Sequence, residues 1–118
     1  MIILVTGGRY YDDAACVDRV LSAMHESTPI THLIHGDASG LDHLAHCWAK
    51  DHGVQPVACE ALWGYYYEQG KPKAAGPIRN RAMAALRPDL VVAFPGGKGT
   101  ANMEATAISL GLPVRRVQ

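Results

Sequence analysis

The sequence predicts an α/β protein with one doubly wound, Rossmann-like parallel sheet of about five strands and helices on both faces. Short apolar runs of strand length alternate along the chain with longer segments whose apolar residues recur every three or four positions. Such alternation is typical of strand–helix–strand units, and glycine-rich turns follow three of the apolar runs. Because crossovers between parallel strands are right-handed, few strand orders remain, and we expect 3-2-1-4-5.

Each predicted strand is a short segment, in most cases an apolar run, bounded by turn residues. The first strand, 2–5, is continuously apolar and stops at Thr6-Gly7-Gly8, as expected of a strand buried on both faces. The other predicted strands are 30–35, 55–59, 90–94 and 113–117.

Four helices are predicted between these strands. Asp12 or Asp13 can cap the first, which continues to about Met24. The others are expected over about 39–52, ended by Gly53, over 76–86, with Pro77 in the first turn, and over 100–110, ended by Gly111.

Segment 60–76 is predicted to be a loop. It is longer than compact α/β units usually need, and loops of this length are commonly functional or disordered. Its aromatic residues Trp63, Tyr65, Tyr66 and Tyr67 cannot all be buried, so they either stack on a base or contact a second subunit. We expect a homodimer contact, with Trp63 the closest of them to a ligand.

The composition predicts a single cytoplasmic domain over residues 1–118. Eleven basic and eleven acidic residues balance, so the charge does not suggest a nucleic-acid or membrane partner. Three cysteines without C-x-x-C spacing fit reduced thiols, and no apolar run is long enough to cross a membrane.

Three glycine-rich turns end strands of the predicted sheet. They are Thr6-Gly7-Gly8-Arg9, Gly36-Asp37-Ala38-Ser39-Gly40 and Pro95-Gly96-Gly97-Lys98-Gly99-Thr100. Strands 1 and 4 flank the topological switch in the expected order, so the first and third turns should face each other across one crevice. Glycines and a helix start at that edge predict a site for a phosphorylated ligand.

Two common nucleotide motifs are absent. A Walker loop needs Ser or Thr after Gly97-Lys98, where Gly99 stands. The dinucleotide fingerprint G-x-G-x-x-G does not follow the first strand, where the sequence reads Gly-Gly-Arg-Tyr-Tyr-Asp.

Four motifs, in this order, carry a family resemblance. The motifs are Val5–Arg9, His35–Asp42, Ala75–Met83 and Phe94–Thr100. Together they resemble the YspA/YpsA-related branch of the SLOG superfamily, and the resemblance extends over nearly the whole chain. That superfamily also holds the LOG phosphoribohydrolases and the DprA DNA-processing proteins. The resemblance implies a Rossmann-like fold that binds nucleotides or nucleotide-derived ligands, so our first hypothesis is a binding or sensing module.

The LOG enzymes supply a second hypothesis, cleavage of the N-glycosidic bond of nucleoside 5′-monophosphates. Their motif is Pro-Gly-Gly-x-Gly-Thr-x-x-Glu, with a catalytic Arg on the preceding helix that Arg79 matches. Met103 stands at the position of the Glu, and Glu104 comes one residue later, which rotates it by about 100° on a helix. The candidate catalytic residues are therefore Arg79 and, displaced, Glu104 or Glu68. A third hypothesis, DNA binding as in DprA, is disfavoured by the neutral charge.

The candidate ligand-binding residues lie in the glycine-rich turns or the helix starts after them. Arg79 and Asn80 either face a phosphate or join a surface salt bridge, and Asp42 either accepts ribose hydroxyls or offsets a helix dipole. Arg9 and Lys98 either line the crevice or point to water, and Thr100 is expected to cap its helix. The full set is Gly7, Gly8, Arg9, Gly36, Asp37, Gly40, Asp42, Arg79, Asn80, Pro95, Gly96, Gly97, Gly99 and Thr100.

A metal site is considered and set aside. His43, His46 and Cys47 have helical spacing and His35 is nearby in sequence, but no matching pair occurs elsewhere. His43, His46 and Lys50 are interpreted as a solvated helix face. We expect neither a metal nor another cofactor.

Overall fold

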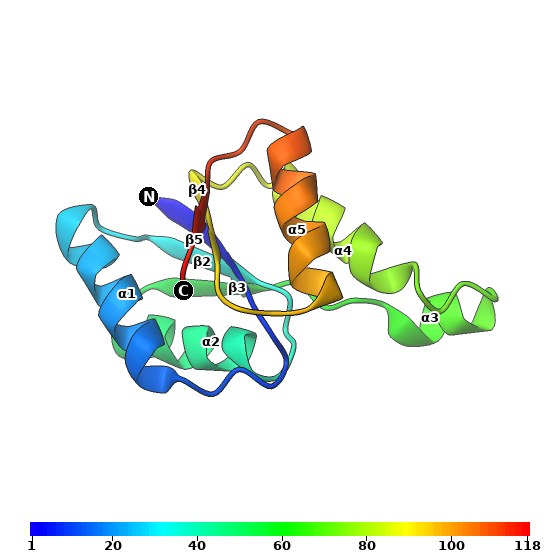
Figure 1. The fold of residues 1–118 in the computed structure, drawn as a ribbon, viewed down its shortest axis with the longest axis horizontal. Coiled ribbons are helices and arrows are strands. Elements are labelled where there is room, and N and C mark those ends of the chain that lie inside the picture. The colour runs from blue at the N-terminus through cyan, green and yellow to red at the C-terminus, as the bar shows by residue number, and fades with distance from the viewer.

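A computed structural model describes all residues, 1–118, and confirms the predicted fold class. Five parallel strands form one sheet in the order β3-β2-β1-β4-β5, as predicted (Figure 1). The strands are β1 (Ile2–Thr6), β2 (His32–His35), β3 (Gln55–Ala58), β4 (Leu90–Ala93) and β5 (Val114–Arg116).

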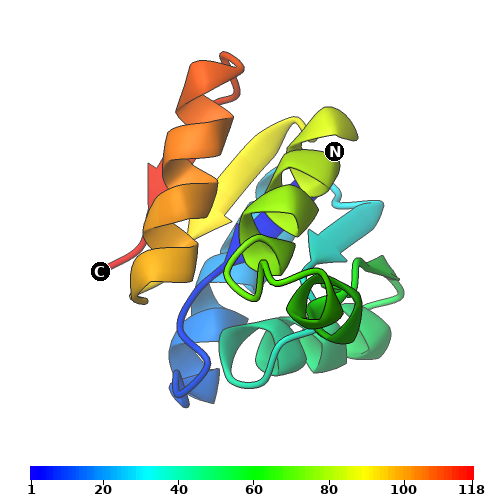
Figure 2. The same cartoon turned by 90° about the vertical axis from the view of Figure 1, so that its right-hand side faces the viewer.

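Two pairs of helices cover the two faces of the sheet. Helices α1 (Ala14–Ser27) and α2 (Leu41–Asp51) pack on one face, and α4 (Ala75–Ala85) and α5 (Lys98–Ser109) lie side by side on the other (Figure 2). Successive residues of β1 serve the two cores in turn: Ile3 and Val5 belong to the α1–α2 core, and Leu4 to the α4–α5 core. The central strands β1 and β4 are therefore buried on both faces, which explains their apolar sequences, whereas the edge strands β3 and β5 are partly exposed.

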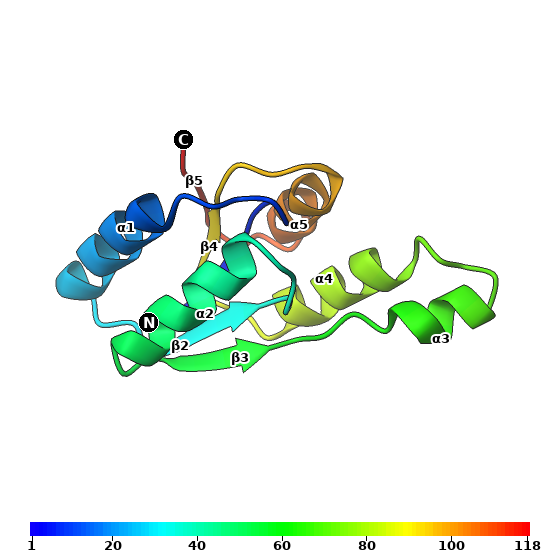
Figure 3. The same ribbon diagram turned by 90° about the horizontal axis from the view of Figure 1, so that it is seen from below.

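The prediction that 60–76 is only a loop is wrong. Residues Trp63–Glu68 form a sixth element, the short helix α3, which projects from the body of the protein beside the start of α4 (Figures 1 and 3). No residue of α3 is buried, so its sequence carries no apolar period from which a helix could be predicted.

Side-chain and backbone caps define the helix starts more closely than the sequence pattern does. Asp13 caps α1 by accepting a hydrogen bond from the Cys16 N–H at 3.0 Å, one of the two residues predicted for this role. Gly97 occupies the N-cap of α5, so the prediction that Thr100 caps this helix is wrong. None of the helices combines the length and the apolarity that crossing a membrane requires.

Parallel pairing brings the strand ends together at one edge. The Phe94 N–H donates to the carbonyl oxygen of Thr6 at 2.8 Å, and two residues further on the Gly8 N–H donates to the carbonyl oxygen of Pro95 at 2.9 Å. The loops after β1 and β4 therefore lie side by side, as the strand order predicts.

Candidate functional site

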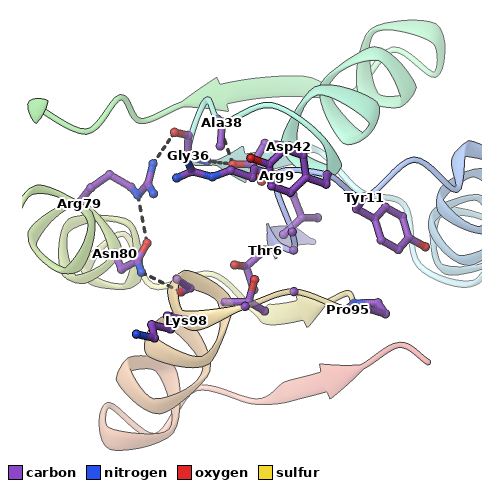
Figure 4. A pocket seen from close by; sticks show the side chains of 18 of the residues that line it. Thr6, Arg9, Tyr11, Gly36, Ala38, Asp42, Arg79, Asn80, Pro95 and Lys98 are labelled. Atoms are coloured by element: carbon purple, nitrogen blue, oxygen red, sulfur yellow. Dashed lines mark hydrogen bonds between the residues drawn. The ribbon is translucent and has the colours of Figure 1, made fainter. Parts of the chain in front are cut away.

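A cavity of about 630 Å³ opens where these loops meet, at the carboxyl edge of the sheet (Figure 4). Its walls come from the loops after β1, β2 and β4, from the first turns of α2 and α5, and from one face of α4. Twelve of the predicted ligand-binding residues line it: Gly7, Gly8, Arg9, Gly36, Asp42, Arg79, Asn80, Pro95, Gly96, Gly97, Gly99 and Thr100.

Two predicted residues, Asp37 and Gly40, are not in the cavity wall. Asp37 is exposed at the outside of its turn. Gly40 has φ +72° and packs against the backbone of Gly8 and Arg9, where a Cβ atom would overlap the chain. Its position requires glycine for loop packing rather than for contact with a ligand.

The glycines of the two facing loops fall into two groups. A Cβ at Gly7 would lie 2.5 Å from Leu41 Cγ, and one at Gly96 would overlap the Thr100 side chain, so these two let elements pack closely. Gly97 and Gly99 have no atom within 4 Å of an added Cβ. Their lack of side chains leaves the space in front of α5 open.

The first turn of α5 presents hydrogen-bond donors to the cavity. The N–H groups of Lys98, Gly99 and Thr100 have no partner within the helix, and Gly97 has no side chain to cap them. A 12-residue helix adds the positive end of its dipole at this point. The arrangement suits an anion.

The turn after β2 has the opposite polarity. The Asp42 carboxylate accepts hydrogen bonds through Oδ2 from the N–H groups of Gly36 and Ala38, at 3.1 and 3.2 Å (Figure 4). The intervening N–H, of Asp37, donates to His35 Nδ1 at 2.9 Å. Because all three donors of this turn are used inside the protein, it offers the cavity acceptors only.

Asp42 is the only carboxylic acid in the cavity wall. Its side chain is 7% exposed, and this burial raises its pKa to about 6 in spite of the hydrogen bonds from Ala38 and Gly36 and the charge of Arg79. Oδ1 has no hydrogen-bond partner, yet it is not an enclosed orphan atom. This second oxygen is an accessible acceptor at the cavity.

Arg79 crosses the edge of the sheet from α4. Its Nη1 donates to the carbonyl oxygens of Gly36 and Cys59, and its Nε donates to Asn80 Oδ1 at 3.0 Å (Figure 4). A Cβ at Gly36 would overlap the guanidinium, so this contact requires glycine. No carboxylate lies within 4 Å of Arg79, which excludes the predicted alternative of a surface salt bridge.

Burial lowers the pKa of Arg79, while the nearby Asp42 opposes the change. A guanidinium remains charged at neutral pH in any case. The cavity therefore contains a half-buried cation with one nitrogen, Nη2, free of protein partners.

Asn80 links this cation to the first turn of α5. Only 4% exposed, it donates through Nδ2 to the Gly99 carbonyl oxygen at 3.3 Å and to Asn102 Oδ1 at 3.0 Å. The sequence analysis did not predict a role for Asn102. Asn102 follows Lys98 by four residues and so lies on the same face of α5. This spacing could have predicted its place near the cavity.

Glu104 is separated from the cavity. It forms an ion pair with Arg116 at 2.5 Å and lines a neighbouring hollow on the β5 side of the Pro95 loop. Met103, at the position of the LOG glutamate, is fully buried in the α4–α5 core. Glu68 lies on α3, also outside the cavity. The structure thus brings neither glutamate to Arg79.

Several lining residues were missed by the sequence analysis. Tyr11 packs edge-on against Phe94 with ring centroids 5.7 Å apart, and Tyr10 is 89% exposed at the same loop. The others are Val5, Thr6, Ala38 and Met83, whereas Lys98 was weighed and does line the cavity. Most adjoin a predicted glycine turn, and Met83 follows Arg79 by one helical turn.

The histidines of α2 differ in part from expectation. His43 and Lys50 are exposed, but His46 is half-buried and hydrogen-bonded to His35 at 2.9 Å, so its assignment to a solvated face is wrong. No three side chains of His, Cys, Asp or Glu are placed to hold a metal ion together.

We expect Asp42→Asn to remove a pH-dependent cost of folding. The folded pKa of Asp42, about 6, lies above its ordinary 3.8, so between these pH values the native state holds a proton that the unfolded state has released. By linkage, this group lowers stability as pH rises from about 4 to about 6, by on the order of 2 to 3 kcal/mol. Asparagine still offers an oxygen to Gly36 and Ala38 without the charge. In urea unfolding at pH 4 to 7, the free energy of unfolding of Asp42→Asn should increase relative to that of the wild type as pH rises. Asp12→Asn, an exposed control, should show no such relative increase.

Comparisons with known proteins agree with this architecture. A family model of the YspA, cpYpsA-related SLOG proteins matches residues 1–66. The Gene 61 protein of Mycobacterium phage D29 is 32% identical over 120 residues, covering 95% of this chain and 92% of the phage protein. The X-ray structure of TM1055 aligns with 96% of this chain and 71% of its own, with a TM-score of 0.69 and 18% identity, which is a likeness of fold. The chain belongs to the YspA, cpYpsA-related SLOG family.

Proposed function

We propose that residues 1–118 form a single domain that binds a nucleotide, or a phosphorylated molecule derived from one, in the cavity at the carboxyl edge of the sheet. The domain acts as a binding or sensing module. The observation that carries the proposal is the polarity of the cavity: unpartnered donors lie on the α5 side and an unpartnered carboxylate oxygen lies on the β2 side. A nucleotide has the matching polarity, since its phosphate accepts and its sugar hydroxyls donate.

The phosphate is assigned to the α5 side. The free N–H groups of the first turn lie there, and Gly97 and Gly99 leave room for an anion to approach the backbone. Lys98 lines the same wall. Arg79, which lacks a carboxylate partner, contributes a charge that a bound anion would neutralise.

The sugar is assigned to Asp42. Its Oδ1 can accept a hydrogen bond from a sugar hydroxyl while Oδ2 remains bound to the Gly36 and Ala38 N–H groups. The cavity volume, about 630 Å³, falls within the range of ordinary small-molecule sites.

Hydrolysis of nucleoside 5′-monophosphates is the second candidate function. Arg79 favours it, because one of its guanidinium nitrogens is free at the cavity. Cleavage of a glycosidic bond ordinarily uses two carboxyl groups, one to assist the leaving group and one to activate water or act as nucleophile. Asp42 is the sole carboxyl group in the wall and Glu104 is paired outside it, so binding is the better supported function.

We also propose that the protein forms a homodimer through α3. Leu62, Trp63, Tyr65 and Tyr67 are each at least half exposed on this projecting segment. Two acidic residues, Glu60 and Glu68, precede two basic residues, Lys71 and Lys73, in this segment. A two-fold contact can therefore pair the acidic residues of one copy with the basic residues of the other.

Adding AMP, GMP, CMP or UMP should separate the two functions. We expect at least one of them to raise the melting temperature, because a ligand at 100 times its Kd stabilises a protein by about 2.7 kcal/mol. We expect no free base on chromatography of the same mixtures. Arg79→Ala should abolish the thermal response, while Arg81→Ala, an exposed arginine on the same helix, should retain it. Base release that Arg79→Ala abolishes would establish the hydrolase instead, and no response to any nucleotide would refute both.

Gly97→Val should remove the ligand response without unfolding the protein. An added Cβ atom has no protein atom within 4 Å there, and the valine side chain would occupy the space in front of the α5 donors. The matched control is Gly64→Val on α3, another glycine with open surroundings and no positive φ. Circular dichroism should find both variants folded, and only Gly97→Val should lose the nucleotide-dependent shift. A retained shift would show that the loop is only a tight turn.

Tyr67→Glu should dissociate the proposed dimer. Tyr67 is 74% exposed, so a charge there alters the surface of α3 and not the core. Tyr10→Glu changes an even more exposed tyrosine away from α3 and serves as the control. Light scattering after size-exclusion chromatography should give a dimer mass for the wild type and Tyr10→Glu, and a monomer mass for Tyr67→Glu. A monomeric wild type would exclude the dimer.

A further inference from the structure

His35, the last residue of β2, joins a hydrogen-bonded chain outside the cavity wall. Its ring is 1% exposed, its Nδ1 accepts from the Asp37 N–H at 2.9 Å, and its Nε2 lies 2.9 Å from Nδ1 of His46 on α2. A peptide N–H can only donate, so neutral His35 must carry its proton on Nε2 and donate it to His46. The order of donors is therefore fixed: Asp37 to His35, and His35 to His46.

The bond to Asp37 is the middle one of three along the Gly36–Ala38 turn. The N–H groups on either side, from Gly36 and Ala38, donate to Asp42 Oδ2. The turn places Asp37 at φ +56°, a conformation that residues other than glycine seldom adopt. The three bonds together hold the chain in that conformation.

Two polar side chains of the cavity, those of Asp42 and Arg79, depend on this turn. Arg79 Nη1 donates to the Gly36 carbonyl oxygen, and Asp42 is oriented by the N–H groups of Gly36 and Ala38. If the Asp37 N–H lost its acceptor, residue 37 could return to negative φ. The peptide groups beside it would then rotate, and their contacts with Asp42 and Arg79 would change.

We propose that His35 is a positioning residue for the ligand cavity: its neutral ring, held by His46, locks the Gly36–Ala38 turn and thereby places Asp42 and Arg79. The effect on affinity rests on the proposed nucleotide binding. The lock itself does not.

The charge state of the pair supports this assignment. Both available ring lone pairs, Nδ1 of His35 and Nδ1 of His46, already accept a hydrogen bond, so an added proton must break one of the two bonds. Burial, and then His46, lower the pKa of His35 to about 4, with Arg79 acting in the same direction and Asp37 against it. Asp42 binds the same turn, and the Cys59 N–H of the β3 end donates to the His35 carbonyl oxygen. The burial of the ring and its two hydrogen bonds therefore both favour the neutral form of His35, which is the form that locks the turn.

The test compares two substitutions of His35. In His35→Asn the amide oxygen can accept from the Asp37 N–H in place of Nδ1, whereas His35→Leu fills the space without an acceptor. The control is His32→Leu, an exposed histidine at the start of the same strand. Hydrogen exchange of the Asp37 amide and the Kd for AMP are measured at pH 7.

We expect His35→Leu to speed exchange of the Asp37 amide and to weaken AMP binding by about tenfold or more, the effect of one or more lost hydrogen bonds. The Kd and the exchange rate of His35→Asn should stay within about threefold of the wild-type values, and those of His32→Leu should equal the wild-type values. Wild-type exchange and affinity in His35→Leu would overturn the proposal, as would an equal loss in both variants, which would indicate packing alone.

Two outcomes remain decisive if a variant does not fold or AMP does not bind. Nitrogen-15 spectra of the wild type should show His35 protonated on Nε2 at pH 7, and a proton on Nδ1 would overturn the proposal. If the wild type binds GMP, CMP or UMP but not AMP, that nucleotide replaces AMP in the measurement. If it binds none of the four, the proposed function fails, and the exchange of the Asp37 amide alone decides whether His35 locks the turn.

Discussion

The Arg79 guanidinium is a half-buried cation whose partners are backbone carbonyls rather than a carboxylate, and the carboxyl edge of the sheet is arranged around it. Moving a charge out of water is costly unless hydrogen bonds compensate. Here the compensation comes from the ends of β2 and β3 and from Asn80. This arrangement ties α4 to strands on one side and to α5 on the other, so the cation that a ligand would meet also holds the walls together.

Asp42 completes the electrostatic balance of the cavity. Burial keeps its pKa well above the usual value for an aspartate, although the positive charge of Arg79 acts to lower that pKa. A carboxylate in this setting is poorly solvated and is stabilised further by any donor that enters the cavity. The site therefore carries a cost in stability for an acceptor that a bound donor would satisfy, a common compromise at functional sites.

The sequence predicts the sheet because the central strands are short apolar runs and helices between the strands, such as α1 and α2, have a clear apolar period. It predicts most of the cavity because parallel strands must end at one edge, where Gly7, Gly36 and Gly96 mark close approaches. Asp37 and Gly40 were misplaced because motif membership does not distinguish a residue facing the cavity from one that shapes the turn. The Glu104 side chain points toward Arg116, and this direction depends on the residue at which α5 begins.

Two other features were beyond pattern analysis for a different reason. Helix α3 buries no side chain, so the burial that produces a hydrophobic period is absent there. The His35–His46 contact joins residues 11 positions apart on a strand and a helix, and it becomes visible only when the two elements are packed. Local sequence specifies neither contact partners nor a helix that has no buried face.

Gly8 connects three segments of this edge through its backbone hydrogen bonds. Its N–H donates to Pro95, and its carbonyl oxygen accepts from both Tyr11 and Leu41, so the loops after β1 and β4 and the start of α2 share one residue. The three segments consequently behave as parts of one rim whose lengths are matched. A residue inserted into or deleted from either loop would displace the other loop and the first turn of α2 together. Variation in loop length among related chains should therefore concentrate away from this rim, for example in the projecting segment that carries α3.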